Sequence, residues 1–534
     1  MKHGIHMDAP AARTLPALLA EMANRYPDQE FVVDGERRRT YAAFQRDVRA
    51  LAAGLLDLGL EADDKVAILM GNQLEWLVAD FAIVAIGGVM VSINTWATGR
   101  ELAYMLEHSD ARALIMADQF ASNDYVAILA PLLNAGALPG LEHIIRVQPD
   151  ARPLERAAAW ETVVARGLRC GPSESDVASA QVQPEDVAYV LYTSGSTATP
   201  KGVQLQHYAL VENMWHIGER QHLKPGDRLW LAVSLFWGLG CENALFALMT
   251  HAGAIVLQRQ FDASEALALI EHERCTVIYA TPNMIQAMTA LPMFDKRPLS
   301  TLRTGLTIGT PEQIRELAEL GPRQICNIYG LTETYGNCAV TDADAPLDLR
   351  CNAVGQPLPG VDMRIVNPDT GVNCPAGTVG EIRVRGYVTC GYLNDAARNA
   401  AAFDEDGYFL TGDLGLLDAG GYLYFRGRLK EMIKTGGINV APVEVEEVLM
   451  SHPGVALAFV VPLPDAERDE IVAALIVAAD EEPATESSLR ALCIEALAAY
   501  KRPRQYQFVS AAQLPLTSTG KVRKQAMPLL FERS

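Results

Sequence analysis

Residues Val190–Gly202 have the sequence VLYTSGSTATPKG, in which a hydrophobic strand runs into a loop of small residues that Pro200 and Lys201 close. Small side chains let backbone N–H groups approach a phosphate closely, and hydroxyl and ammonium groups add further donors. The pattern GxxxxGK[ST] cannot be fitted here, so the loop is not of the Walker A type. A strand followed by such a loop favours phosphate binding over an ordinary Ser/Thr-rich surface turn. The predicted phosphate contacts are Thr193, Ser194, Gly195, Ser196, Thr197 and Lys201.

Helical and strand patterns alternate on both sides of this loop. Thr40 is placed to cap a helix whose apolar positions, from Phe44 to Leu56, follow helical spacing, with Gly59 at its end. Strands are predicted at residues 66–70, 89–93, 187–192, 228–233, 254–257 and 277–280, and a second helix at residues 74–86. This order is typical of α/β proteins with a largely parallel sheet.

The texture changes after about residue 350, where Gly and Pro become frequent. The pattern predicts a strand at residues 380–385, a hairpin at 415–428 with its turn at Asp418–Gly421, and helices near 442–450 and 487–499. A chain of 534 residues is too long for one core. We therefore predict a large domain of α/β layers with a β-rich section at residues 1–428, and a small α+β domain at residues 429–534.

Composition excludes several functions. A net charge of −20 argues against a general nucleic-acid binder. From Tyr500 onward, however, seven Lys/Arg face one acid, which indicates either a solvated basic patch or a group that handles phosphates. No apolar run reaches the roughly 18 residues of a membrane span, so no transmembrane segment is expected. The start has no apolar signal core, and Met7 would also serve as an initiator. Nine cysteines without a CxxC pair favour a reduced, cytoplasmic setting.

The 190–202 loop closely resembles the phosphate-binding signature of adenylate-forming enzymes, which include acyl-CoA synthetases, adenylation domains of peptide synthetases and beetle luciferases. Ala198 departs from the glycine that is usual in the family, and we expect a slightly stiffer loop. The segment NIYGLTET, Asn327–Thr334, resembles the family's nucleotide motif. The resemblance implies that Tyr329 stacks on adenine and that Asn327 binds its amino edge. It also implies that Gly330 lines the nucleotide site, that Thr332 meets the phosphates and that Glu333 holds Mg²⁺.

Further motifs follow in the family's order, in YFLTGD, in FRGRLKEMIKTGG and in LPLTSTGKVRK. They imply that Asp413 accepts the ribose hydroxyls and that Arg428 lies beside the ribose and α-phosphate. Lys521 corresponds to the catalytic lysine of a mobile small domain, and Lys430 to the hinge of that domain. Lys434, Gly436 and Gly437 would line the approach of coenzyme A, although a glycine pair is also common in simple loops. The implied catalytic residues are Lys521, Thr332, Glu333 and Arg428, and the implied cofactors are ATP, Mg²⁺ and CoA as a substrate.

The stretch SLFWGLG, Ser234–Gly240, bears on the acid that is activated. Amino-acid-activating relatives carry an aspartate where this chain has Trp237, and many ligases and luciferases carry a histidine there. An α-amino acid is therefore not expected. Trp237 could bound an apolar acyl pocket or lie in the core. The predicted pocket residues are Phe236, Trp237, Gly238, Thr281 and Gly309.

Three functions remain open to the sequence. The first is an ATP-dependent acyl-CoA ligase for an apolar acid, either medium or long chain or aromatic. The second is an enzyme that loads the pantetheine of a carrier protein. The third is a degenerate, non-catalytic member used for interaction, which the survival of Glu333, Asp413, Arg428 and Lys521 argues against.

Overall fold

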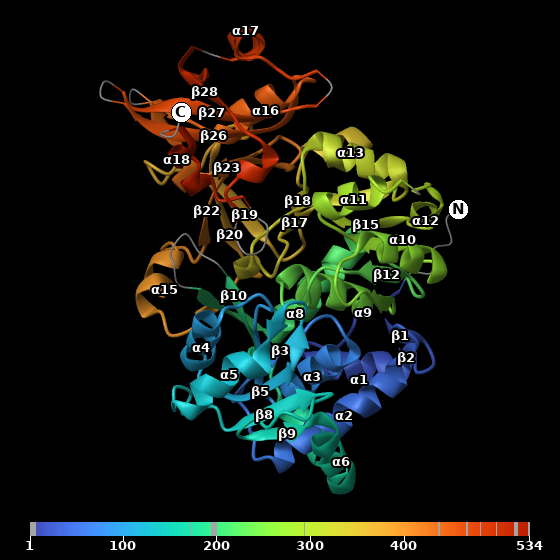
Figure 1. The fold of residues 1–534 in the computed structure, drawn as a ribbon. Coiled ribbons are helices and arrows are strands. Elements are labelled where there is room, and N and C mark those ends of the chain that lie inside the picture. The colour runs from blue at the N-terminus through green and yellow to red at the C-terminus, as the bar shows by residue number, and fades with distance from the viewer. Residues whose placement is uncertain are drawn as a thin grey trace. The chain divides into compact units, whose positions relative to one another are not determined.

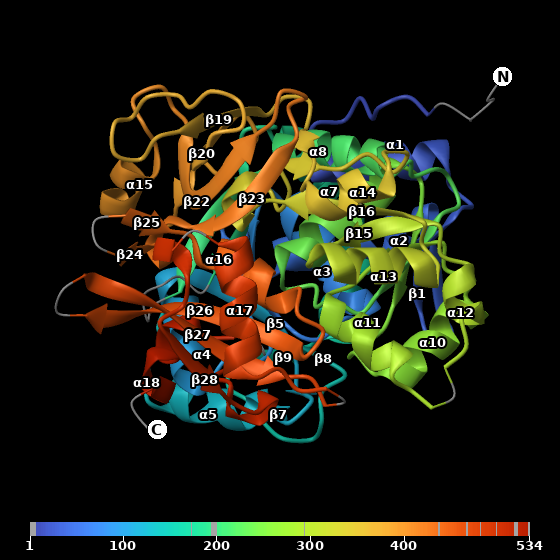
Figure 2. The same ribbon diagram turned by 90° about the horizontal axis from the view of Figure 1, so that it is seen from above.

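The computed structural model describes residues 7–171, 173–193, 200–292, 294–435, 438–465, 468–480, 482–497, 499–516 and 522–531 (Figure 1). The chain divides into two compact units. The large unit comprises Met1–Met363, Val384–Phe409 and Gly421–Leu423, and the small unit comprises Arg364–Arg383, Leu410–Gly420 and Tyr424–Ser534. Both units mix helices with strands, as Figure 2 also shows, which confirms the predicted α/β class. The proposed domain limit at residue 428 stays a prediction.

The α-helices of the large unit are α1 (Leu15–Arg25), α2 (Tyr41–Asp57), α3 (Leu74–Ala85), α4 (Gly99–His108), α5 (Tyr125–Asn134), α6 (Trp160–Cys170), α7 (Ser173–Gln181), α8 (His207–Arg220), α9 (Leu245–Thr250), α10 (Ala263–His272), α11 (Pro282–Thr289), α12 (Arg297–Ser300), α13 (Pro311–Leu320), α14 (Leu347–Asn352) and α15 (Ala396–Ala402). A nine-stranded sheet has the order β18 (Gln356–Pro357), β17 (Ala339–Val340), β16 (Gln324–Tyr329), β15 (Thr304–Thr307), β14 (Val277–Tyr279), β12 (Arg228–Leu231), β13 (Ala254–Leu257), β1 (Glu30–Asp34), β2 (Arg37–Thr40). An eight-stranded sheet has the order β21 (Gly391–Tyr392), β11 (Lys201–Gln206), β10 (Val187–Thr193), β4 (Val89–Ser92), β3 (Lys65–Leu69), β5 (Ala111–Ala117), β8 (His143–Val147), β9 (Ala157–Ala159). Two short strands, β6 (Gln119–Phe120) and β7 (Asn123–Asp124), pair with each other.

The core of the large unit joins both sheets. One buried cluster contains residues of β1 and β12 from the first sheet, of β3 and β10 from the second, and of the helices α1, α2, α3, α8 and α9. Within it the rings of Phe31, Phe44, Phe81 and Phe246 follow one another at centroid separations of 5.0, 5.4 and 5.9 Å, each edge to face. Edge-to-face pairs add to the free energy gained by burial.

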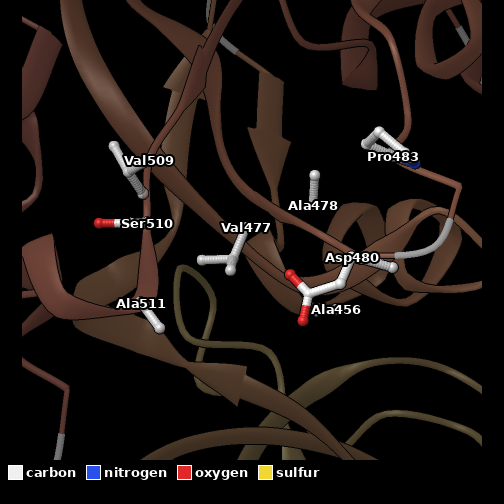
Figure 3. A pocket seen from close by; sticks show the side chains of 9 residues that line it. Ala456, Val477, Ala478, Asp480, Pro483, Val509, Ser510 and Ala511 are labelled. Atoms are coloured by element: carbon white, nitrogen blue, oxygen red, sulfur yellow. The ribbon is translucent and has the colours of Figure 1, made fainter.

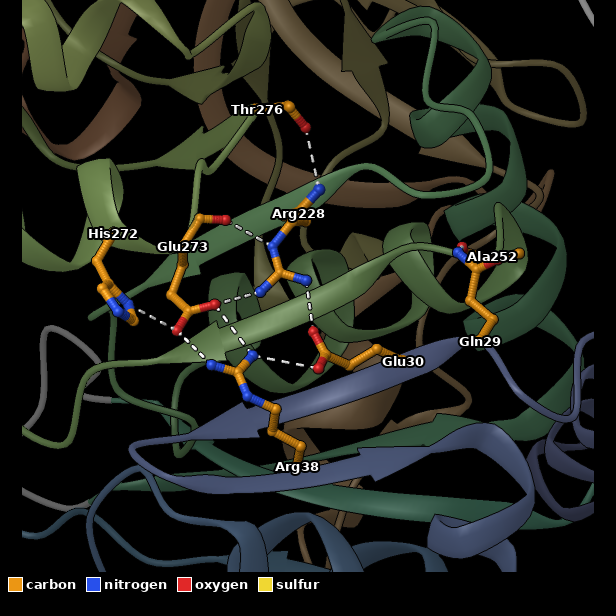
Figure 4. Close-up of polar contacts among 8 residues, drawn as sticks. All are labelled: Gln29, Glu30, Arg38, Arg228, Ala252, His272, Glu273 and Thr276. Carbon is orange, nitrogen blue, oxygen red and sulfur yellow. Dashed lines mark hydrogen bonds and ion pairs between the residues drawn. The ribbon is translucent and has the colours of Figure 1, made fainter.

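A network of charges joins β1 and β2 to β12 and to the residue that follows α10 (Figure 4). Glu273, which follows α10, accepts hydrogen bonds from Arg38 Nη2 at 2.7 Å and from Arg228, whose Nε also donates to the Glu273 carbonyl at 2.7 Å. Both arginines reach Glu30 as well. The hydrogen bond from Arg38, followed by the positive charges of Arg38 and Arg228, holds the pKa of Glu273 below its ordinary value. Each buried charge here has its partners, so the network is structural.

The remaining strands form two further sheets. A four-stranded sheet has the order β19 (Asp362–Val366), β20 (Gly380–Arg385), β22 (Phe409–Leu417), β23 (Leu423–Arg428). The small unit also holds β25 (Ile438–Val440), β24 (Ile433–Thr435), β27 (Asp469–Ala478), β26 (Val455–Asp465) and β28 (Gln505–Phe508), with helices α16 (Pro442–Met450), α17 (Glu486–Ala496) and α18 (Pro528–Phe531). Among the described residues, no helix is both long enough and apolar enough to cross a membrane.

Local signals placed many of these elements correctly. Thr40 caps α2, where its Oγ1 accepts from the N–H of Ala43 at 3.2 Å. The predicted strand at 380–385 and helix at 442–450 coincide with β20 and α16, and β22 and β23 form the predicted hairpin. The prediction for α17 was too long, because Leu497 takes an extended conformation that ends the helix.

Candidate active site

The predicted acyl and nucleotide residues of the large unit follow neighbouring strands. β12, β14, β15 and β16 are parallel, so the chain leaves all of them at one edge of the sheet. Trp237 follows β12, Thr281 follows β14, Gly309 follows β15 and Gly330 follows β16. The carboxyl edge of a parallel sheet is where α/β proteins bind ligands. We call this the carboxyl edge.

The two ends of the phosphate loop lie side by side. Thr193, the last residue of β10, pairs in antiparallel register with Lys201, the first residue of β11. Ser194, Gly195, Ser196 and Thr197 lie outside the described residues, so their predicted role is not tested. The Nζ of Lys201 lies 5.3 Å from the ring centre of Tyr392, over its face.

Tyr392 connects Lys201 with the predicted metal ligand. Glu333 and Thr332 belong to the 3₁₀ turn η2 (Thr332–Thr334), and the Tyr392 hydroxyl donates to Glu333 Oε1 at 2.8 Å. Burial, followed by the negative charge of Glu333, raises the pKa of Tyr392. The sequence analysis missed Tyr392, because a tyrosine after a glycine in a loop-rich region carries no signal of its contacts.

The nucleotide motif is tightly built around Tyr329, the last residue of β16. Tyr329 and Asn327 are buried. Asn327 Nδ2 donates to the carbonyl of Ala353 at 3.0 Å, and its Oδ1 accepts from the N–H of Ile328 at 2.9 Å. A side chain on Gly330 would meet the Gly336 carbonyl oxygen at 2.1 Å, so only glycine fits there. The contacts of Tyr329 and Asn327 with adenine stay predictions.

Asp413 and Arg428 come together within the small unit. Asp413 lies on β22 with its side chain 4% exposed, and Arg428 ends β23 with its side chain 59% exposed. Arg428 Nε lies 3.3 Å from Asp413 Oδ1. Gly412 takes a φ of +68°, which turns the strand before Asp413, and the Asp413 N–H donates to Thr411 Oγ1 at 3.0 Å. A buried carboxylate next to an exposed guanidinium suits recognition of ribose hydroxyls and phosphate.

An aromatic group stands at the carboxyl edge, where the segment after β12 meets the segment after β4. The Trp96 ring lies 5.2 Å from that of Phe236 and 5.5 Å from that of Trp237, and the two latter rings are 5.2 Å apart. The Ser92 hydroxyl donates to the Phe236 carbonyl at 3.1 Å. Trp237 is partly exposed rather than sealed in the core. Trp96 was not predicted, because it lies far from Trp237 in the sequence.

For the other predicted residues the structure gives the element in which each lies and few contacts. Thr281 precedes α11, and a side chain on Gly309 would come within 3.2 Å of Pro282, so these two positions are neighbours. Lys430 lies in the 3₁₀ turn η3 (Leu429–Glu431), and Lys434 lies in β24. Gly436, Gly437 and Lys521 fall outside the described residues.

The small unit has a hollow of about 660 Å³ that is separate from these residues (Figure 3). It is lined by Ala456, Val477, Ala478, Ala479, Asp480, Pro483, Val509, Ser510 and Ala511. Most of this lining is small and apolar, and it contains no cation for a phosphate and no predicted site residue. The hollow therefore does not compete with the carboxyl edge as the active site.

Comparison with known proteins supports the same assignment. The AMP-binding enzyme family matches residues 19–393, and the AMP-binding enzyme C-terminal domain matches residues 444–521. The acyl-CoA ligase sidI of Aspergillus fumigatus is 32% identical, over 96% of this chain and 90% of its own. The mitochondrial medium-chain acyl-CoA ligase ACSF2 of Macaca fascicularis is 31% identical, over 98% of this chain and 88% of its own. The crystal structure of ATP-bound MatB from Rhodopseudomonas palustris matches with a TM-score of 0.83 at 27% identity, over 96% of this chain and 98% of that one.

The chain belongs to the family of AMP-binding enzymes. Within that family it is an AMP-forming acyl-CoA ligase, as the sequence resemblance predicted. The family and the ATP-bound structure support ATP as its nucleotide.

Proposed function

We propose that this ligase activates a medium-sized or larger apolar carboxylic acid, aliphatic or aromatic, and passes the acyl group to coenzyme A. In the first step a carboxylate oxygen of the acid attacks the α-phosphorus of ATP, and pyrophosphate leaves. In the second step the sulfur of CoA, having lost its proton, attacks the acyl carbon, and AMP leaves. The acid itself is the nucleophile of the first step, so no side chain has to be one.

The aromatic group at the carboxyl edge carries the proposal about the acid. Trp96, Phe236 and Trp237 lie together at the end of a parallel sheet, and Trp237 is partly exposed there. Such a wall favours an apolar chain by roughly 0.8 kcal/mol per methylene, and it penalises an unpaired ammonium. Acetate and α-amino acids are therefore poor substrates in this proposal.

Positive charge lowers the barrier of the first step, because two anions must approach each other. We assign this work to Lys201, Arg428 and Lys521 and to the N–H donors of the phosphate loop. Glu333 fits an Mg²⁺ ion, because this cation takes one or two protein carboxylates together with substrate phosphates. Bound Mg²⁺ would neutralise charge on the phosphate oxygens.

The second step needs the acyl adenylate to be reached by a thiol. We propose that residues 429–534 turn about Lys430 after pyrophosphate leaves, which takes Lys521 out of the site. Lys434, Gly436 and Gly437 then line the approach of the pantetheine arm. Asp413 and Tyr329 hold the ribose and adenine through both steps.

A screen of carboxylic acids tests the proposal. The purified enzyme is given ATP, Mg²⁺, CoA and one acid at a time, and pyrophosphate release and acyl-CoA formation are both measured. The series runs from acetate through octanoate to dodecanoate, with benzoate, cyclohexanecarboxylate and leucine. We expect kcat/KM to rise with apolar size and leucine to be inactive.

Other outcomes of this screen would support a different substrate or a different function. Acetate as the best substrate would overturn the apolar pocket. Pyrophosphate release with acyl transfer only to a pantetheine-loaded carrier protein, and none to CoA, would establish the second function considered above. No acid-dependent pyrophosphate exchange with any acid would indicate a non-catalytic protein.

A further inference from the structure

Glu242 is a buried acid without a partner, next to the predicted acyl pocket. It lies in the π-helical turn η1 (Leu239–Ala244), directly after the segment that carries Trp237. Its side chain is fully buried, and neither Oε1 nor Oε2 has a hydrogen-bond partner among the described residues. Buried polar groups in folded proteins are nearly always paired, so an unpaired carboxyl needs an explanation. Single π-helical turns are frequent at functional sites.

Asn243, the next residue in the same turn, has a structural role. Asn243 Nδ2 donates to the Tyr335 carbonyl at 3.1 Å, and Asn243 Oδ1 accepts from Asn337 Nδ2 at 3.0 Å. Asn243 thus ties η1 to the segment after the nucleotide motif. The carboxyl group of Glu242, in contrast, makes no hydrogen bond to any described residue.

The carboxyl group of Glu242 faces the pocket wall at Gly238. A side chain on Gly238 would begin 2.6 Å from Glu242 Oε1, so the carboxyl lies where a side chain at position 238 would otherwise be. Gly238, Trp237 and Leu239 are partly exposed, while Phe236 and Gly240 on either side of them are buried. The partly exposed Gly238 therefore lies next to the buried acid.

The surroundings of Glu242 favour its neutral form. Burial first, and the negative charge of Glu333 second, raise the pKa of Glu242 well above the ordinary value. Among the described residues, the other ionisable groups that interact with the charge of Glu242 are Tyr189, Cys241 and Tyr335, and none of these three is a cation. A protonated carboxyl offers one donor and one or more acceptors.

We propose that Glu242 is a specificity residue that hydrogen-bonds a hydroxyl or carbonyl oxygen on the chain of the acid substrate. This inference rests on the proposed function, in which the acid lies against Trp237 and Gly238. The preferred substrate is then an otherwise apolar acid that carries one oxygen function away from its carboxylate. A purely hydrocarbon acid leaves the buried carboxyl unpaired in the complex, and it binds less well for that reason.

Matched pairs of acids test the proposal. Octanoate is compared with its hydroxy and oxo derivatives at carbons along the chain, and cyclohexanecarboxylate with its 4-hydroxy and 4-oxo derivatives. The measured quantity is the ratio of kcat/KM for acyl-CoA formation within each pair, for wild type, Glu242→Gln and Glu242→Leu. We expect the wild type to prefer the oxygenated member of at least one pair by about tenfold. Glu242→Leu should abolish or reverse that preference, and Glu242→Gln should keep most of it.

Asp80 supplies a matched control. It is also fully buried, and its Oδ2 accepts from the Tyr189 hydroxyl at 2.7 Å, so it has a structural partner even though its Oδ1 has none among the described residues. Asp80→Asn also alters a buried acid, but one that does not contact Gly238. It should therefore leave the kcat/KM ratios within each pair of acids unchanged. Because the readout is a ratio of two acids, a loss of folded enzyme does not alter it.

Four results would overturn the inference. The same ratios in wild type and Glu242→Leu would show that Glu242 does not contact the acid. Preference for an acid with a chain ammonium group would show that Glu242 binds as an anion. Turnover of neither member of any pair would overturn the proposed function and this inference with it, whereas turnover of both at equal rates would overturn the inference alone.

Discussion

Glu273 and Glu242 are both buried carboxyls of the large unit, and their surroundings are opposite. Glu273 lies among two arginines that lower its pKa and join β1, β2 and β12. Glu242 lies against a glycine, with burial and another acid raising its pKa. Where polar groups are fully paired within the protein, they maintain the architecture. Where a buried polar group lacks a protein partner, a ligand is the natural candidate to supply one.

Two lysines near the C-terminus also differ in whether their charge is paired within the protein. Substituting the lysine predicted to act on the substrate has the largest expected effect on activity. Lys524 pairs with the buried Glu446 at 2.6 Å, whereas Lys521 is predicted to act on the α-phosphate. Lys521→Ala should lower the rate of adenylation about 100-fold or more, because a charge-stabilising donor is lost. Pyrophosphate release measures this step, and thioester formation from pre-made acyl adenylate should largely survive.

Lys524→Ala is the matched control for that experiment. It should lower the thermal stability of the small unit while keeping adenylation within a few-fold of wild type, because its charge is used by Glu446. Equal losses in both half-reactions of Lys521→Ala would make Lys521 structural, and the proposed rotation about Lys430 would be wrong.

The charge network gives the next largest effect, and it is an effect on stability. Glu273→Gln should lower the free energy of unfolding by about 2 kcal/mol, because Arg38 and Arg228 lose a charged partner. Denaturant unfolding measures this difference, and the preference among acids should not change. Glu271→Gln, on the exposed face of α10, should leave stability unaltered.

The loss should also depend on pH. The folded-state pKa of Glu273 is lowered, so its contribution is present above the unfolded pKa of about 4.3 and is lost as pH falls through the lower folded value. The difference in the free energy of unfolding between wild type and Glu273→Gln should therefore shrink as the pH falls below about 4.3. A difference that stays constant to low pH would show that the charge of Glu273 is not what stabilises the network.

Substitution of Trp237 has the smallest expected effect, measured for each methylene of the acid. It distinguishes a role in the acyl pocket from a role in the core. Trp237→Ala should shift preference toward bulkier acids, by roughly fourfold in kcat/KM for each methylene that enters the freed space. The ATP KM should stay nearly constant, and both parameters come from steady-state assays across the acid series. A higher ATP KM with the same ranking of acids would place Trp237 beside the nucleotide instead.

Sequence patterns predicted the elements better than the contacts between them. The cap at Thr40 and the apolar runs of β3, β10 and β13 are local signals, and they placed their elements within a residue or two. Trp96 and Tyr392 were missed because each acts through a partner far away in the sequence. Glu242 was missed for another reason: an acid between helical residues normally indicates a solvated face, and only the π-helical turn brings it inside.

The carboxyl edge also bears on how such an enzyme could acquire new substrates. Trp237, Thr281 and Gly309 lie on three separate connections, while the nucleotide motif begins within a fourth strand, β16. Exchanging one of those three connections for that of a relative leaves the strand ladder and the nucleotide motif as they are. With the acyl pocket proposed above, substrate range would be a modular property of this architecture, and recombination between relatives would explore it one loop at a time.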